Sequence, residues 1–140
     1  MRKLSAISRQ LSAISYQLER GMQDFRDLKV WEKAHKLVLA VYVSTASFPS
    51  EERFGLTSQM RRAAASVPAN IAEGCVRSSD ADFARFLHTA MGSASEVEYF
   101  SLLARDLGFL TDMSHQKLTN DAQEVKRMLA ALIGRLRADS

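Results

Sequence analysis

Hydrophobic residues recur every three or four positions in four segments of this chain, and short polar, glycine- or proline-containing stretches separate the segments. This spacing places the recurring side chains along one side of an α-helix. The alternation is strictest in the third and fourth segments. The recurring positions there are Phe83, Leu87, Ala90, Ala94, Val97, Ser101 and Ala104, followed by Leu118, Ala122, Val125, Leu129, Leu132 and Leu136. Both segments are predicted to be helices with one buried side.

Residues at the ends of these two segments indicate where each helix begins or ends. Ser79 is expected to cap the third helix, and the acidic residues that follow suit the positive end of the helix dipole. Gly108 is predicted to end it. Thr111 is expected to cap the fourth helix. The run of small residues at 90–95 predicts that another helix approaches the third one closely.

The first segment is predicted to form a helix that begins near Asp27, whose carboxylate can accept hydrogen bonds from first-turn amides. The stretch 47–50 ends it, because the residue before Pro49 resists the α conformation. The positions predicted to face inward are Leu28, Trp31, His35, Val38, Val41, Tyr42 and Thr45.

The second segment is predicted to start at Thr57 and to contain a proline, Pro68, near its middle. A proline there removes one backbone hydrogen bond and usually bends a helix. Two short helices with a break at Val67 are the alternative. A single kinked helix is favoured because the apolar spacing keeps its phase across the proline. Its inward positions are Met60, Ala64, Val67 and Ile71, and Gly74 is the expected stop.

Four helices joined by short connections predict an all-α protein, an antiparallel up-down-up-down four-helix bundle at residues 22–140. The composition agrees, because 6 glycines and 2 prolines are few for a chain of 140 residues. The single cysteine, Cys75, excludes an internal disulfide and favours a reducing cytoplasmic location. Apolar runs fall short of the roughly 20 residues that span a bilayer, which argues against a membrane partner.

Residues 1–21 form an N-terminal extension that is expected to lie outside the bundle. The extension contains two nearly identical heptads, SAISRQL at 5–11 and SAISYQL at 12–18. Three interpretations compete: a short coiled-coil seam, an organellar transit peptide, and a translated tandem repeat upstream of a natural start at Met22. The translated repeat is favoured, because two heptads are too few for a convincing coiled coil.

The formal net charge of +3 comes from the extension, where four basic residues accompany one glutamate. Residues 22–140 therefore contain 15 basic and 15 acidic side chains and are neutral. Net charge gives the bundle no support for nucleic-acid binding, although a local basic surface can still form.

Motifs that carry chemistry are scarce, and we predict no catalytic, metal or cofactor site and therefore no enzyme. A Glu-x-x-His pair at Glu32 and His35 resembles one part of a two-metal bundle site, but the only partial second copy, Asp112 with His115, starts a helix. Cys75 is expected to fill space, and His88 to be a partly buried polar residue.

Four arginines are the candidate nucleic-acid-binding residues: Arg61, Arg62, Arg77 and Arg85. If they converge on one side, they can contact phosphates. The competing interpretation is a solvated surface on which Glu73, Asp80 and Asp82 neutralise the arginines.

Three motifs together resemble a known family. They read DFRDLKVW at 24–31, EERFGLTSQMRRAA at 51–64 and VPANIAEG at 67–74. They closely resemble the bacterial four-helix bundle proteins called 23S rRNA intervening-sequence proteins, and the resemblance runs from about Phe25 to Leu136. It identifies Pro68, Asn70, Glu73 and Gly74 as the structural family motif. Asn70 and Glu73 are expected to satisfy backbone or neighbouring-subunit groups around the proline.

The resemblance implies a homopentameric ring, and similarity to accessory proteins of diversity-generating retroelements implies association with nucleic acid. The family usually continues after Glu73-Gly74 with an aromatic and several basic residues, whereas this chain keeps only Arg77 before Asp82. Two hypotheses follow: an RNA-associated homo-oligomer, and a protein–protein assembly or scaffold module without nucleic-acid affinity, whose partner is a further protein.

Overall fold

The computed structural model describes residues 24–139, and this part of the chain contains four α-helices, two 3₁₀ turns and no strand. The all-α prediction is confirmed at this level. The elements in chain order are η1 (Phe25–Asp27), α2 (Lys29–Thr45), η2 (Ser50–Glu52), α3 (Leu56–Cys75), α4 (Asp80–Asp106) and α5 (Asp112–Asp139). The predicted extension at residues 1–21 lies outside the described residues.

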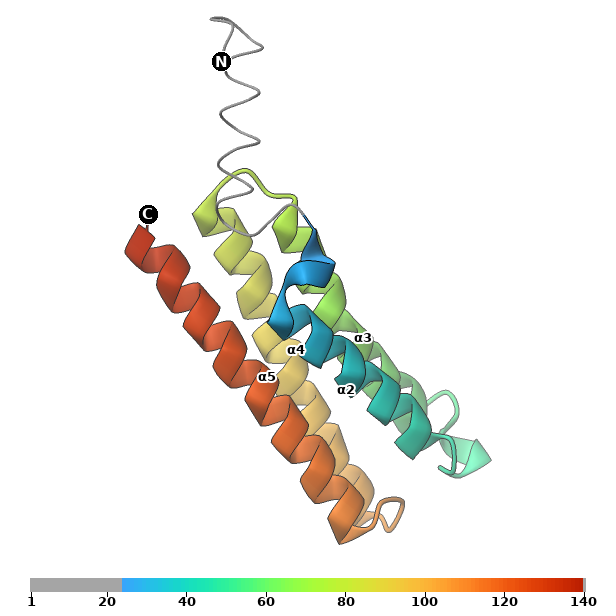
Figure 1. Cartoon of the computed structure of the whole chain (residues 1–140). Coiled ribbons are helices and arrows are strands. Elements are labelled where there is room, and N and C mark those ends of the chain that lie inside the picture. Colours follow the sequence, from blue (N-terminus) through green and yellow to red (C-terminus); the bar gives the residue numbers. More distant parts are fainter. Residues whose placement is uncertain (1–23, 140) are drawn as a thin grey trace, which may run out of the picture.

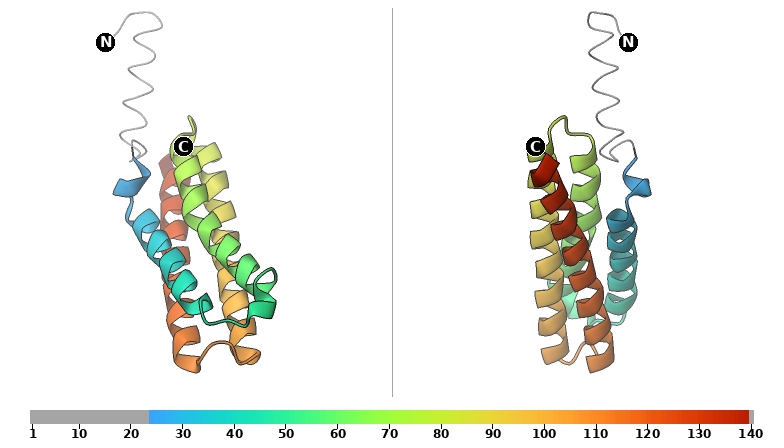
Figure 2. Two further views of the ribbon diagram at one scale, coloured as in Figure 1. Left: turned by 90° about the vertical axis from the view of Figure 1, so that its right-hand side faces the viewer. Right: turned by 60° about the vertical axis from the view of Figure 1, so that its left-hand side comes forward.

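The four helices lie side by side at the corners of a square (Figure 1, Figure 2). Helix α2 packs against α3 and α5, and α4 packs against the same two helices. Within the described residues, α2 does not touch α4 and α3 does not touch α5. The α2–α3 and α4–α5 connections lie at one end of the molecule, which we call the lower end, and the α3–α4 connection lies at the other, the upper end (Figure 1).

The predicted ends of α4 and α5 are confirmed. Ser79 Oγ accepts a hydrogen bond from the backbone N of Asp82 at 3.1 Å, and Thr111 Oγ1 accepts one from the backbone N of Ser114 at 3.1 Å. Each bond satisfies a first-turn amide that has no partner inside the helix. Gly108 follows α4 with φ +83°, a conformation that glycine adopts without steric cost.

The first two helices start close to the predicted positions, but the capping residues predicted for them are wrong. Asp24, not Asp27, caps the first turn: its carboxylate accepts from the backbone N of Arg26 at 2.9 Å and begins η1. Leu28 is then extended, and α2 starts at Lys29. Helix α3 starts at Leu56, whose backbone N donates to Glu52 Oε1 at 3.0 Å, so Thr57 lies buried inside the helix. An upstream carboxylate therefore supplies the acceptor for η1 and for α3, whereas α2 itself has no side-chain cap.

Helix α3 continues through Pro68 as a single helix, as predicted. Gly74 is not its stop, because the helix extends to Cys75. Gly74 is instead buried beneath α4, and a Cβ atom at this position would lie 2.7 Å from Cδ1 of Phe83. The glycine therefore permits close packing of the two helices and does not supply a left-handed turn.

Two clusters of buried side chains, one above the other, form the core. The upper cluster includes Ile71, Phe83 and Leu129, and the lower one includes Met60, Val97 and Leu118. All inward positions predicted for α3, α4 and α5 are buried. Of the small residues at 90–95, Ala90, Ser93 and Ala94 are buried, and Ser93 contacts α3 through Ser66, whereas Gly92 and Ser95 are exposed.

The predicted inward side of α2 is correct only in part, although Leu28, Trp31 and Val38 pack against the core. Its buried residues are Val30, Ala34, Leu37, Val41 and Thr45. Only Val41 and Thr45 belong to the predicted set. Trp31 and Val38 are partly buried, whereas His35 and Tyr42 are exposed. Helix α2 therefore turns a second set of apolar and aromatic side chains outward.

Candidate nucleic-acid interface

The four candidate arginines occupy two separate places. Arg61 and Arg62 lie on the first half of α3, and Arg77 follows the end of that helix, about four turns away. Arg85 lies on the first half of α4, beside Arg77. The structure thus brings Arg77 and Arg85 together and leaves the adjacent pair at the other end of α3.

Arg61 connects α3 to the end of α2. Its Nε donates to Thr45 Oγ1 at 2.8 Å, and its guanidinium lies over the ring of Tyr42, 4.5 Å from the centroid. Thr45 is buried and donates in turn to the carbonyl of Val41 at 2.8 Å. These contacts hold the guanidinium in a fixed place between two helices, a structural role.

Arg62 has a different environment. It is exposed and forms no hydrogen bond or ion pair with residues 24–139. It lines a groove of about 450 Å³ between α3 and α4, in which Ser58, Gln59 and Ser66 also lie, with Phe54 and Phe100. Among the four candidates, its positive charge is the one that the described residues leave available to a partner.

Arg77 and Arg85 share the carboxylate of Asp82. The Arg85 guanidinium lies 2.8 Å from Asp82 Oδ1, and Arg77 lies 4.0 Å from Oδ2 of the same residue and 3.4 Å from Glu73. Both guanidiniums also stack on Phe86, at 4.5 and 4.7 Å from the ring centroid. This arrangement matches the competing interpretation, in which acidic side chains neutralise these arginines.

The residues of the family motif have structural surroundings. Asn70 Nδ2 donates to the carbonyl of Ser66 at 2.8 Å and to Ser66 Oγ at 2.9 Å. Ser93 of α4 donates to the same hydroxyl at 2.9 Å. The expected backbone role of Asn70 is confirmed, and it extends into a link between α3 and α4. Glu73 pairs with Arg77, and Pro68 is buried.

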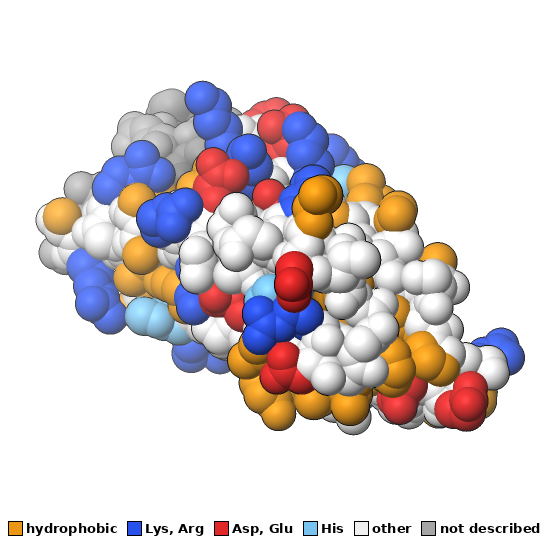
Figure 3. Space-filling model, turned by 90° about the horizontal axis from the view of Figure 1, so that it is seen from below, with side chains coloured by type: hydrophobic (Ala, Val, Ile, Leu, Met, Phe, Trp, Pro, Cys, Tyr) orange, Lys and Arg blue, Asp and Glu red, His pale blue; other side chains and the backbone are white. Residues whose placement is uncertain are grey.

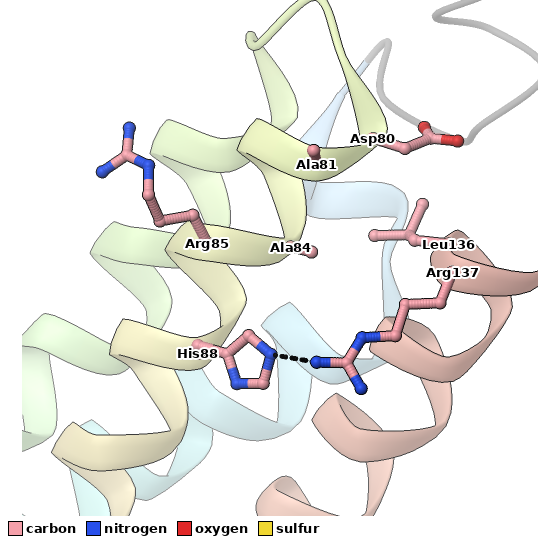
Figure 4. Close-up of a pocket in the computed structure, with 7 residues that line it drawn as sticks. All are labelled: Asp80, Ala81, Ala84, Arg85, His88, Leu136 and Arg137. Carbon is pink, nitrogen blue, oxygen red and sulfur yellow. Dashed lines mark hydrogen bonds between the residues drawn. The ribbon is translucent and has the colours of Figure 1, made fainter. Parts of the chain in front are cut away.

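A second concave surface lies at the upper end, between the start of α4 and the end of α5 (Figure 4). It encloses about 390 Å³ and is lined by Asp80, Ala81, Ala84, Arg85, His88, Leu136 and Arg137. The Arg137 guanidinium donates to His88 Nε2 at 3.2 Å, whereas Arg85 points away from both (Figure 4).

The sequence analysis missed this contact, because 49 residues separate the two partners. His88 is also exposed rather than partly buried. The contact could have been predicted from the antiparallel pairing of α4 with α5, because this pairing brings the start of one helix beside the end of the other.

Further unpaired cations lie on α5. Arg127 and Arg135 are exposed and have no ion-pair partner within residues 24–139. Arg135 and Lys29 line a shallow groove of about 310 Å³ between α5 and α2, with Met128 and Leu132 in its floor. Lys126, in contrast, pairs with Glu98 at 2.7 Å.

The side chains that could bind a metal ion or take part in catalysis lie apart from one another in the fold. No group of three or more His, Cys, Asp or Glu side chains in the described part of the chain could hold a metal ion. His35 stacks on Trp31, with ring centroids 5.0 Å apart, and His115 Nδ1 lies 2.9 Å from Ser101 Oγ. Cys75 is buried in the upper core, as expected of a space-filling residue.

No helix at residues 24–139 is both long and apolar enough to cross a membrane.

The fold and its surface define a helical bundle whose candidate binding surfaces lie in shallow grooves between neighbouring helices. The model of the 23S rRNA-intervening sequence protein family matches residues 26–131, and the chain therefore belongs to this family. This confirms the resemblance.

A crystal structure of a protein of unknown function from the S23 ribosomal protein family of Bacteroides thetaiotaomicron VPI-5482 is similar, with a TM-score of 0.69. It is 26% identical, and the match covers 75% of this chain and 95% of that one. A comparison with curated proteins gave no match.

Proposed function

We propose that the protein is a non-enzymatic, up-down-up-down four-helix bundle of the bacterial cytoplasm, which assembles as a homopentamer and associates with RNA. The observation that supports RNA binding is that several exposed arginines have no acidic partner in the described chain, among them Arg62, Arg127 and Arg135. Such cations bind phosphates and release counterions, so affinity falls steeply with salt. Membership of a family named after a segment of 23S rRNA supports the same conclusion.

Exposed apolar side chains support self-assembly. Leu39, Tyr42 and Val43 face outward from α2, and Tyr99 and Leu102 face outward from α4. Both sets surround the lower core cluster, and α2 and α4 occupy opposite corners of the bundle. Figure 3 views this lower end and shows apolar side chains gathered over parts of its surface.

Two different surfaces on opposite sides suit a head-to-tail contact between identical subunits, which closes into a ring when the rotation permits. Both surfaces lie at the same level of the bundle, so successive subunits can be related by rotation with little translation. The connections at alternate ends of the molecule support the up-down-up-down arrangement within each subunit.

The proposed association with RNA is tested by titrating a labelled structured RNA with the full chain at about 50 and 200 mM salt. Phosphate contacts lose much of their affinity over this range. Arg127→Ala with Arg135→Ala should weaken binding. Arg105→Ala is the matched control, because Arg105 already pairs with Asp106 at 3.1 Å. A chain shortened to residues 22–140 shows whether the affinity belongs to the extension. Loss of all binding on shortening would contradict an RNA site on the bundle.

The assembly part is tested by light scattering. Val43→Asp should dissociate the oligomer, because it places a charge in the proposed contact. Val76→Asp is the control, since Val76 is similarly exposed (69% against 76%) but lies at the upper end. A monomeric wild-type protein would contradict the homopentamer.

The alternative function, a protein–protein assembly or scaffold module, is favoured by the same apolar surfaces and by the neutral charge of residues 22–140. An intact oligomer that binds no RNA at low salt would support it.

A further inference from the structure

The groove between the lower halves of α3 and α4 combines three kinds of group that bind an unpaired nucleotide. It is lined by the aromatic rings of Phe54 and Phe100, by Arg62, and by hydroxyl and amide groups. We propose that this groove binds an unpaired nucleotide of RNA, with the base against Phe54 and the phosphate against Arg62. The inference rests on the proposed function and names the site at which RNA is held.

The exposure of Phe54 is the first argument. Its side chain is 88% exposed at the end of a short loop, although the loop is fixed by hydrogen bonds on both sides. Arg53 lies over the Phe54 ring, 5.4 Å from the centroid. A ring with one side open to solvent and a cation beside it can stack a base of any sequence, as aromatic residues do in proteins that bind single strands.

The polar side chains that line the groove can form hydrogen bonds with a bound base. Ser66 Oγ accepts from both Asn70 and Ser93, which leaves its own proton for a bond into the groove. Gln59 and Ser58 add an amide and a hydroxyl on the same wall. Base edges present donors and acceptors that such groups can pair with.

Charge is the third argument. Arg62 has no partner within residues 24–139, and Arg53 contributes a second cation beside the groove. Among the described residues, Glu96 is the one acidic side chain that lines it. The net charge around the groove is therefore slightly positive, which favours a singly charged phosphate over an acidic protein segment with several charges.

A second copy of this chain is the competing occupant. The centre of an interface between identical subunits is usually apolar and poor in charge. Most of the side chains that line this groove are polar, and the exposed apolar side chains of α2 and of the outward side of α4 lie outside it. These observations favour RNA over self-association at this place.

The test compares variants of the full chain in binding a single-stranded RNA that contains the fluorescent base 2-aminopurine. Phe54→Ala should weaken binding about tenfold and abolish fluorescence quenching, because one stacked base contributes about 1–3 kcal/mol. Met113→Ala is the matched control, since Met113 is an apolar residue of similar exposure (83%) at the same end. Phe54→Tyr should restore binding, because it keeps the ring.

Arg62→Ala should reduce the slope of log affinity against log salt by about 0.7, the value for one phosphate contact to a single strand. Arg105→Ala should leave the slope unchanged. A duplex RNA should respond less than the single strand to Phe54→Ala, since its bases are not available for stacking.

Each result supports or overturns the inference. If the wild-type protein binds RNA and both groove variants bind equally well with unchanged quenching, the nucleotide site is wrong and the proposed function stands. If the variants keep their affinity for RNA but lose mass in light scattering, the groove is a contact between copies. If the wild-type protein binds no RNA, the proposed function and the inference fail together.

Discussion

Helices α4 and α2 stand at opposite corners of the bundle and differ in how their side chains are distributed. Every residue of α4 that was predicted to be buried is buried, although Tyr99 and Leu102 face outward. Helix α2 carries apolar residues around most of its circumference, with Leu37 1% exposed and Leu39, two residues later, 53% exposed. Periodicity identifies a buried side only when the opposite side is polar.

The two helices also differ in how they pack against their neighbours. The α3–α4 contact is built from small residues, a buried glycine and a serine–asparagine link. Helix α2 packs against α3 and α5 and keeps a second apolar surface outside. We therefore expect substitutions in α4 to change the stability of the fold, and outward substitutions in α2 to change assembly.

The largest effect is expected at Phe83, which α4 buries completely against α3. Phe83→Ala should reduce the free energy of unfolding by about 3–5 kcal/mol, the range for removing a buried aromatic ring. Trp31→Ala on α2 should cost less than half as much, because Trp31 is only partly buried. Urea unfolding followed by circular dichroism measures both. Equal losses would show that α2 is packed as firmly as α4.

The register of α2 is tested by a pair of leucines two residues apart. Leu37→Ala should cost about 2–5 kcal/mol, because it leaves a cavity in the lower core. Leu39→Ala should change the free energy of unfolding of the subunit by less than about 0.5 kcal/mol. The reverse order of effects would show that Leu39, and not Leu37, packs in the core.

Gly74 and Gly92 form a matched pair on the two helices of the close contact. Gly74→Ala places a methyl group 2.7 Å from Phe83 Cδ1, and this overpacking should cost about 1–3 kcal/mol. Gly92→Ala meets no atom within 4 Å and should stabilise α4 by roughly 0.5–1 kcal/mol. Thermal unfolding distinguishes them by the sign of the shift in Tm. A stabilising Gly74→Ala would mean that α3 and α4 can move apart without cost.

The smallest effect concerns the polar link between these helices. Ser93→Ala removes the hydrogen bond to Ser66 and should cost about 0.5–1 kcal/mol after the higher helix propensity of alanine is included. Ser95→Ala, at an exposed position on the same helix, should be neutral or slightly stabilising. Identical midpoints in urea for the two variants would show that the link contributes nothing.

The sequence was sufficient for features that depend on local chemistry. Ser79 and Thr111 cap helices because their hydroxyls reach amides three residues away, and Gly108 ends α4 through its own backbone conformation. The sequence was insufficient where the partner is distant or the packing decides. Glu52 caps α3 from four residues upstream, and the role of Gly74 depends on a ring of the next helix.

The candidate site was predictable only in part. The adjacent arginines share one motif, yet Arg61 is engaged with Thr45 and Tyr42 while Arg62 is open to a partner. The difference arises from a rotation of about 100° between neighbouring helical residues. Contacts such as His88 with Arg137, or Phe54 with the groove of α4, require the fold itself.

The contacts of Arg61 have a consequence for the order in which the chain folds. The final turn of α2 has carbonyls without helical partners, and the Arg61 guanidinium reaches one of them, that of Tyr42, at 3.5 Å. Arg61 belongs to the following helix, so this termination cannot form while α2 is isolated. The last turn of α2 should stay frayed until α3 docks, and the two helices should gain protection from hydrogen exchange as one cooperative unit.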